Sequence, residues 1–163
     1  TPYGSTVWKK SKGEDQYRRA VYTYWKRTSP YPSMESFDGP DREVCTARRI
    51  RTNTPLQALV TLNDSAFLEA ARHVADVLQK ENPGSAEKQI RAGFEKAVGH
   101  DIDENSFEAL ENLYRKALLK YQQKPEEAKE MGGDTAALHQ PERSALIVVT
   151  NAILNLDEYV TKN

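Results

Sequence analysis

DENSFEALENLYRKALLKYQQ, residues 103–123, is the stretch that decides the fold class of this 163-residue chain. Its apolar side chains recur at intervals of three and four residues, as on one face of an α-helix. They are Phe107, Leu110, Leu113, Tyr114, Ala117, Leu118 and Tyr121. Asp103 precedes them in the position of a helix cap. We therefore predict a long helix from Asp103 to about Gln123, central in the fold and covered on one side only.

The same spacing continues on both sides of this stretch. It predicts further helices over residues 16–28, from Pro55 as a short helix, over 64–80, over 86–98 and over 141–157. Gly99 is placed to close the helix before residue 103. We expect Phe94 to share one core with Phe107, Leu110, Tyr114 and Leu118.

The remaining segments lack helical spacing. Pro32 and Gly39-Pro40 predict irregular structure over residues 31–40, and the polar stretch 124–140 should loop around one helical turn. No stretch alternates apolar and polar residues for long enough to predict a strand. The expected fold class is all-α, with five to six helices in an irregular bundle. We expect a flexible arm over residues 1–15 and a single helical domain over residues 16–163.

Composition excludes several classes of protein. The single cysteine, Cys45, excludes an intrachain disulfide, a paired-cysteine zinc site and covalent haem attachment. The longest apolar run, residues 145–149, is far shorter than the roughly 20 residues of a membrane span. Residues 1–60 carry 11 basic and 6 acidic side chains, a charge of +5, and residues 61–163 carry 12 and 18, a charge of −6. The total of −1 does not favour a nucleic-acid partner, and we expect the two halves to pair partly with each other.

The histidines and the acidic residues show no metal-binding pattern. His73, His100 and His139 are too widely spaced for a local site, and structural roles are favoured for all three. Asp101, Asp103 and Asn105 resemble the start of a calcium loop, but Ser106 and Asn112 stand where that loop needs Gly and Glu. We therefore expect no metal, no haem and no other cofactor in this fragment.

One segment, FDGPDREVCTARRIRTNTPLQ (residues 37–57), concentrates opposite charges. Its acids are Asp38, Asp41 and Glu43, and its arginines are Arg42, Arg48, Arg49 and Arg51. Three interpretations are open. Arginine forks can bind carboxylates and fix a loop, arginines can bind an external anion, or the acids and Cys45 can act in catalysis. No histidine lies nearby to activate Cys45.

We favour the interpretation in which the arginines bind the carboxylates and fix the loop. It predicts that Arg42 and at least one of Arg48 and Arg49 pair with Asp38, Asp41 or a later acid such as Asp64. It also predicts that Cys45 is partly buried. Asn53 or Thr54 should cap the helix that begins at Pro55, and Gln57, Asn63 and Asp64 complete the structural motif.

Residues 22–64, YTYWKRTSPYPSMESFDGPDREVCTARRIRTNTPLQALVTLND, closely resemble the signature of the domain of unknown function 1553, a planctomycete-specific family. The shared elements run in order from the Tyr24-Trp25 pair through the Phe-Asp, Pro-Asp-Arg, Arg-Arg, Thr-Asn-Thr-Pro-Leu-Gln and Leu-Asn-Asp motifs. Residues 152–159 also resemble the family's ending. Gly99-His100 departs from its usual Gly-Arg. The resemblance implies the C-terminal portion of a larger family domain.

The resemblance also implies a setting. Family members are large extracytoplasmic bacterial proteins that often carry a planctomycete-type cytochrome c module, so the parent protein is expected to be periplasmic or secreted and associated with redox chemistry. No reaction is established for the family. We expect a structural or interaction module whose partners are other domains of the parent protein. The alternatives are a hydrolytic enzyme domain acting on polysaccharide, and binding of anions or sulfated glycans through Arg42, Arg48, Arg49 and Arg51.

Overall fold

The structure of the chain, a computed structural model, describes residues 13–24, 31–40, 45, 47–48, 52, 54–133 and 141–160. Contacts within the chain define two compact units, Thr1–Thr61 (unit 1) and Leu62–Asn163 (unit 2). Each unit is described by itself. The single domain expected over residues 16–163 and the flexible arm over residues 1–15 therefore stay predictions.

Unit 2 contains three helices that the apolar spacing predicted. They are α3 (Ser65–Glu81), α4 (Ala86–Val98) and α5 (Glu104–Gln123). Side chains cap the N-termini of α3 and α5. At α3 the Asp64 carboxylate accepts a hydrogen bond from the backbone N–H of Ala66, and at α5 the Asp103 carboxylate accepts from the backbone N–H groups of Asn105 and Ser106. Gly99 ends α4 in a left-handed conformation, with φ of 95°, which glycine adopts without strain.

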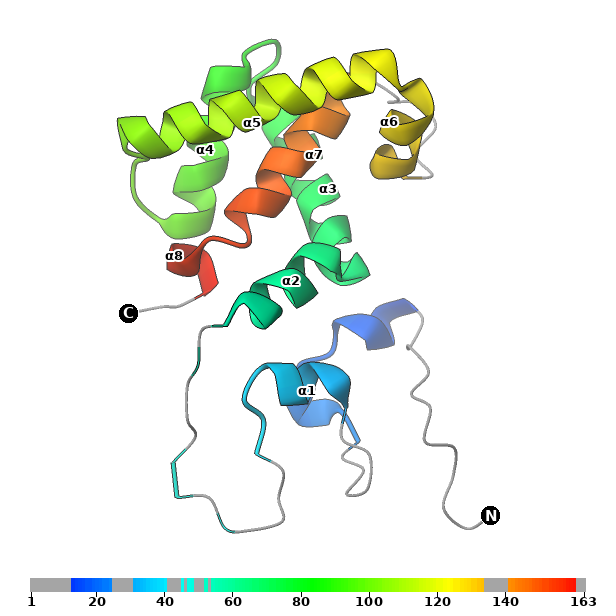
Figure 1. The fold of residues 1–163 in the computed structure, drawn as a ribbon, viewed down its shortest axis with the longest axis vertical. Helices are drawn as coiled ribbons and strands as arrows, with labels where there is room; N and C mark the ends of the chain where they lie inside the picture. Colours follow the sequence, from blue (N-terminus) through cyan, green and yellow to red (C-terminus); the bar gives the residue numbers. More distant parts are fainter. Residues whose placement is uncertain are drawn as a thin grey trace. The chain divides into compact units, whose positions relative to one another are not determined.

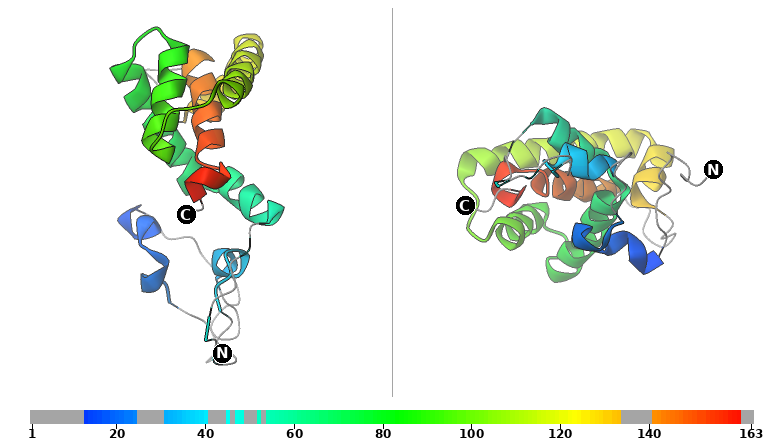
Figure 2. Two further views of the ribbon diagram at one scale, coloured as in Figure 1. Left: turned by 90° about the vertical axis from the view of Figure 1, so that its left-hand side faces the viewer. Right: turned by 90° about the horizontal axis from the view of Figure 1, so that it is seen from below.

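The centre of unit 2 is α7 (Pro141–Ile153), which packs against α3, α4, α5 and α6 (Pro125–Gly132). Figures 1 and 2 show α7 in orange, between α3 and the long α5. The prediction that α5 is central was wrong. The sequence SALIVV, residues 144–149, gives α7 apolar or small side chains on nearly every side, and such a helix is buried all round. By contrast, α5 keeps a charged outer face.

The core of unit 2 contains the residues expected from their spacing. Phe94, Phe107, Leu110 and Tyr114 are buried in one cluster, and Leu118 packs against it while partly buried. α7 adds its own fully buried apolar side chains, which are Ala145, Leu146, Ile147 and Val149. The shared core is therefore confirmed.

Two segments of unit 2 differ from the predictions. Residues 125–132 form two turns of helix, α6, rather than one, because Pro125 stands at a first-turn position that suits proline. The last helix, predicted to run from Pro141 to Asp157, ends at Ile153, and the short α8 (Asp157–Val160) follows. The backbone N–H groups of Asn155 and Leu156 bond three residues back rather than four, so the chain turns at this point.

The described part of unit 1 holds two short 3₁₀ turns, Gly13–Tyr17 and Ala20–Tyr22, and the helices α1 (Pro32–Ser36) and α2 (Pro55–Asn63). The helix predicted over residues 16–28 does not form in the described residues 16–24. Val21 and Tyr24 are 77% and 74% exposed there, and a helix whose apolar side chains stay exposed gains little stability from packing. α1 also replaces the irregular structure predicted after residue 31. α2 crosses the boundary of the two units, since its last two residues, Leu62 and Asn63, belong to unit 2.

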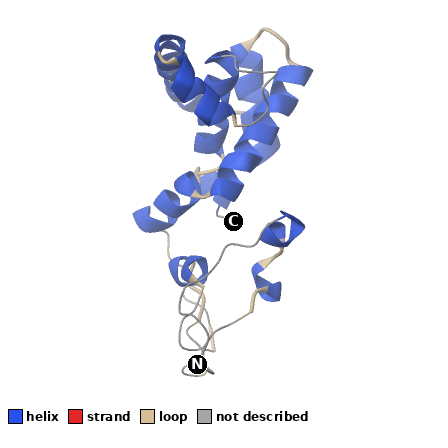
Figure 3. Cartoon of the chain, turned by 90° about the vertical axis from the view of Figure 1, so that its right-hand side faces the viewer, coloured by secondary structure: helices blue, strands red, loops and turns tan. Residues whose placement is uncertain are grey.

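The fold class is all-α. Helices are the only regular elements in the part of the chain that the structure describes, and Figure 3 colours them all as helix. That part contains eight α-helices, where five to six were predicted, because α1, α6 and α8 are short and have little apolar periodicity. Among the described residues, no helix combines the length and the apolar character that crossing a membrane requires.

Candidate functional site

Asp38 and Gly39 terminate α1 in unit 1. Asp38 has φ of 55°, a left-handed conformation that aspartate tolerates better than most residues. The N–H of Gly39 donates to the carbonyl oxygen of Met34 at 2.6 Å. A Cβ at position 39 would lie only 2.6 Å from that same oxygen, so the position admits only glycine without a shift of the backbone. This turn fixes the backbone of Asp38 and therefore the point from which its side chain extends.

The Asp38 carboxylate bonds to residues well along the sequence. It accepts hydrogen bonds from the backbone N–H of Thr52 at 2.7 Å and from the Thr52 hydroxyl at 2.8 Å. The side-chain amide of Gln57 donates to the same carboxylate at 3.4 Å and to the Thr52 hydroxyl oxygen at 3.0 Å. Asp38 and Thr52 are thereby joined at the base of the intervening loop, and we call these three residues the Asp38 clasp.

Gln57 connects the clasp to the start of α2. Its side-chain oxygen accepts from the backbone N–H of Thr54 at 3.1 Å, while the Thr54 hydroxyl accepts from the backbone N–H of Gln57 at 3.3 Å. This reciprocal pair is a capping box, which satisfies two free amides at a helix N-terminus. Gln57 is buried, with 8% exposed, so both ends of its amide are used. Capping by Thr54 is confirmed, and Asn53 lies outside the described residues.

Beyond Pro40, the charged loop closed by the clasp is described only at Cys45, Ala47 and Arg48. All three are exposed. The expectation that Cys45 is partly buried was therefore wrong: its thiol meets solvent instead of the packed apolar surroundings that such a role needs.

Arg48 makes no ion pair with any described carboxylate, so the pairing expected for at least one of Arg48 and Arg49 now depends on Arg49. Two of the acids that were expected to receive an arginine make other bonds. Asp38 is bound by Thr52 and Gln57, and Asp64 caps α3 through a 2.7 Å bond from the N–H of Ala66. Asp41, Arg42, Glu43, Arg49 and Arg51 lie outside the described residues, so their pairing stays a prediction.

Asn63 and Asp64 fall at the junction of α2 and α3. Asn63 is the exposed last residue of α2, and Asp64 is the cap of the next helix. Their assignment to one structural motif with the charged segment stays a prediction. Asp64 belongs to unit 2, and the clasp belongs to unit 1.

A second polar cluster, in unit 2, was missed by the sequence analysis. Arg143 of α7 is 2% exposed and binds the Asp76 carboxylate of α3 with two nitrogens, at 2.6 and 3.1 Å. Its remaining nitrogen donates to the carbonyl oxygen of Gly132 at 2.9 Å. Arg72 of α3 donates to the carbonyl oxygens of Met131 and Glu130. Two arginines thus satisfy the last carbonyls of α6, where positive charge is favoured.

Four further ionisable side chains of unit 2 lie at helix ends, in a surface ion pair or in the core. His100 follows the end of α4, its Nδ1 lies 2.8 Å from the carbonyl oxygen of Asp101, and its Nε2 lies 3.6 Å from Glu158. Hydrogen bonds from Ser106 and Asn105 lower the pKa of Asp103. Lys120, together with Lys124, lowers the pKa of Glu127. Burial raises the pKa of Tyr114.

Among the described residues, no three His, Cys, Asp or Glu side chains are grouped as a metal ion requires. His73 is exposed on α3, and His139 lies outside the described residues.

The comparisons with known proteins identify a family. Residues 1–114 match the model of PSD1, described as a protein of unknown function (DUF1553). The chain belongs to this family. The matched range includes all of unit 1, the Asp38 clasp and the helices of unit 2 through most of α5. The resemblance of residues 152–159 to the DUF1553 ending lies beyond the match and stays a prediction. Neither the curated proteins nor the solved structures contain a significant match to the chain.

Proposed function

We propose that this DUF1553 chain is a helical interaction module of a multidomain bacterial protein that works outside the cytoplasm. The observation that carries the proposal is the Asp38 clasp. Asp38 accepts hydrogen bonds from Thr52 and Gln57, so the carboxylate is used to hold the loop and the start of α2 together. This use favours a structural role for Asp38 over the acid–base role that a hydrolytic domain would give it.

Exposed apolar side chains in unit 1 support the proposal. Leu56 and Leu59 lie one turn apart on α2 and are 59% and 57% exposed, and Val21, Tyr22 and Tyr24 are exposed as well. Grouped apolar side chains on a surface mark interaction sites. The partners that we propose are other domains of the parent protein. The extracytoplasmic setting and a redox-associated parent rest on the family resemblance of residues 22–64.

The experiment is a titration of this chain against the rest of the parent protein, produced as a separate polypeptide. We expect saturable binding that Leu59→Ser weakens at least about tenfold, since burial of a leucine contributes about 1.5–3 kcal/mol. Leu119→Ser is the matched control, because Leu119 is equally exposed, at 58%, but lies on α5. Failure of the wild-type chain to bind any part of the parent protein would contradict the proposal.

A second candidate function is anion binding, which one observation favours. Arg48 is exposed and bonds to no described carboxylate, so its guanidinium has donors to offer a sulfate or carboxylate. Retention on a sulfated polysaccharide resin at rising salt tests this function. We expect Arg48→Ala to elute earlier than Arg115→Ala, in which the lost arginine comes from an exposed pair with Glu111. Identical elution of the two variants contradicts anion binding through this loop.

A further inference from the structure

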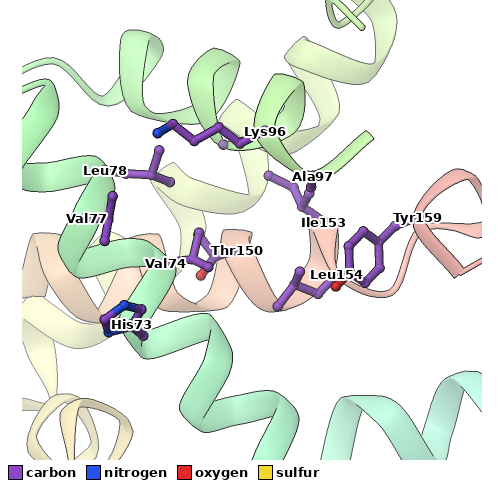
Figure 4. A pocket seen from close by; sticks show the side chains of 11 residues that line it. His73, Val74, Val77, Leu78, Lys96, Ala97, Thr150, Ile153, Leu154 and Tyr159 are labelled. Carbon is purple, nitrogen blue, oxygen red and sulfur yellow. The ribbon is translucent and has the colours of Figure 1, made fainter. Parts of the chain in front are cut away.

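A pocket of about 220 Å³ lies in unit 2 among α3, α4, α7 and α8. Figure 4 shows side chains from all four helices around it. Its walls are mainly aliphatic, formed by Val74, Val77, Leu78, Ala97, Ile153 and Leu154. The space is separate from the Asp38 clasp, which belongs to unit 1.

The interior of the pocket suits an apolar group. Leu78 packs closely on Gly93 of α4, where a Cβ would lie only 2.9 Å from Cδ1 of Leu78, so the open space of the pocket lies away from Gly93. The hydroxyl of Thr150, a polar group of the wall, lies 3.0 Å from the carbonyl oxygen of Ala71, to which it donates. An apolar ligand group therefore leaves no polar atom of Thr150 unsatisfied.

One residue of the lining, Lys96, carries a positive charge, which favours an anion. His73 and Lys96 line the pocket together with the phenol of Tyr159, and the lining contains no carboxylate. Lys96 extends beside Leu78 in Figure 4. Its ammonium lies 2.8 Å from Glu81, but both side chains are about half exposed, and such pairs contribute little. An ammonium has three N–H donors, so Lys96 can bind a second carboxylate as well as Glu81.

From this geometry we infer that the pocket binds a small monocarboxylate with a compact apolar body, of the size of benzoate. An apolar cavity of about 150 Å³ already holds a benzene ring, so 220 Å³ accommodates a ring with one substituent. The ring lies against the aliphatic side chains of Val74, Ala97 and Ile153, and the carboxylate lies toward Lys96. α8 supplies Tyr159 as a wall, and the adjacent Glu158 lies 3.6 Å from His100.

The test is a titration of the full chain with benzoate, followed by NMR. We expect saturable binding at one site with a dissociation constant of about 1 mM or tighter, and binding of benzyl alcohol about tenfold weaker. Lys96→Gln should remove the preference for benzoate over benzyl alcohol. Lys116→Gln, which changes an exposed lysine of α5, should keep it. Absence of saturable benzoate binding up to about 20 mM overturns the inference, and so does an unchanged preference in Lys96→Gln.

A pocket-filling variant tests the location independently of charge. Ala97→Leu places three more carbons in the lining and should abolish benzoate binding while the far-ultraviolet circular dichroism stays helical. Should that variant fail to fold, the wild-type spectra decide. Benzoate should then shift the methyl signals of Val77, Ala97 and Ile153 and leave the exposed Leu119 unshifted. Shifts confined to residues outside the pocket overturn the assignment.

Discussion

Arg143 and Asp76 form a two-bonded ion pair between α7 and α3, with Nε–Oδ1 at 2.6 Å and Nη2–Oδ2 at 3.1 Å. The pair is asymmetric in burial, because the Arg143 side chain is 2% exposed and the Asp76 side chain is 26% exposed. The guanidinium also satisfies the Gly132 carbonyl. One side chain of the central helix therefore holds both α3 and α6.

Removal of one partner of this pair should destabilise unit 2. Asp76→Ala leaves the guanidinium of Arg143 buried without its counter-charge, and we expect the free energy of unfolding to fall by about 3 kcal/mol, at the low end for buried pairs because Asp76 is partly exposed. Urea denaturation followed by circular dichroism measures the change. Glu111→Ala, which breaks the exposed pair with Arg115, is the control and should change stability by no more than about 0.5 kcal/mol. Equal effects of the two substitutions would show that the Arg143 pair is not buried in solution.

The core assignment gives a second prediction. Leu110 is 8% exposed on the inner face of α5, so Leu110→Ala should lower the free energy of unfolding by about 2–5 kcal/mol through lost burial and a residual cavity. Leu119→Ala, on the same helix at 58% exposed, should cost less than about 0.5 kcal/mol. Thermal melting of both variants separates these outcomes. A melt of Leu110→Ala that matches the wild type would contradict the assigned face of α5.

The Asp103 cap should make the stability of the fold depend on pH. Hydrogen bonds from Ser106, and from the N–H of Asn105, lower its pKa in the folded chain. A lowered folded pKa means that the stabilisation is present above the unfolded value of about 3.9 and is lost as pH falls through the folded pKa. Asp103→Asn keeps a capping oxygen but does not titrate. Its melting temperature should therefore decline less steeply than that of the wild type between about pH 5 and pH 2. Parallel declines would show that Asp103 contributes nothing to the acid sensitivity.

The local part of the fold was predictable from the sequence. The stripe from Phe107 to Tyr121, the Asp103 cap and the Gly99 stop all act within one or two turns, so periodicity and capping rules located α5 closely. The centrality of α7 depends on packing between helices and was missed. The spacing of residues 17–24 is also helical, but Val21, Tyr22 and Tyr24 are exposed and no α-helix forms there, so periodicity alone did not predict the structure.

In the candidate site, too, the contacts between neighbouring residues were predictable and those between distant residues were not. The partners of the capping box, Thr54 and Gln57, are three positions apart, and a cap at Thr54 was predictable. Asp38 and Thr52 are 14 positions apart, and Arg143 and Asp76 are 67 apart, so no local rule selects these partners among the other acids. The charge density of residues 37–57 suggested arginine pairing, whereas the described bonds of Asp38 come from a hydroxyl, a backbone amide and a side-chain amide.

The effect of Arg48→Ala on stability tests whether Arg48 takes part in the predicted ion-pair network. A buried, paired Arg48 would make Arg48→Ala strongly destabilising, but the side chain is exposed, so we expect a change within about 0.5 kcal/mol. Chemical denaturation of Arg48→Ala beside the wild type measures it. A loss of about 3 kcal/mol or more would restore the ion-pair interpretation of the loop.

The Asp38 clasp should control local opening at the base of the loop. Asp38→Ala removes the acceptor for the backbone N–H of Thr52, a charge-assisted bond of 2.7 Å. Such bonds contribute about 1.5–3 kcal/mol, so hydrogen exchange at the Thr52 amide should accelerate by about tenfold or more. Asp15→Ala, which breaks an exposed pair with Arg18 in the same unit, is the control and should leave Thr52 exchange unchanged. If Thr52 exchanges at the same rate in Asp38→Ala and in the wild type, the carboxylate does not close the loop in solution, and Asp38 becomes available again for the acid–base role that the clasp argues against.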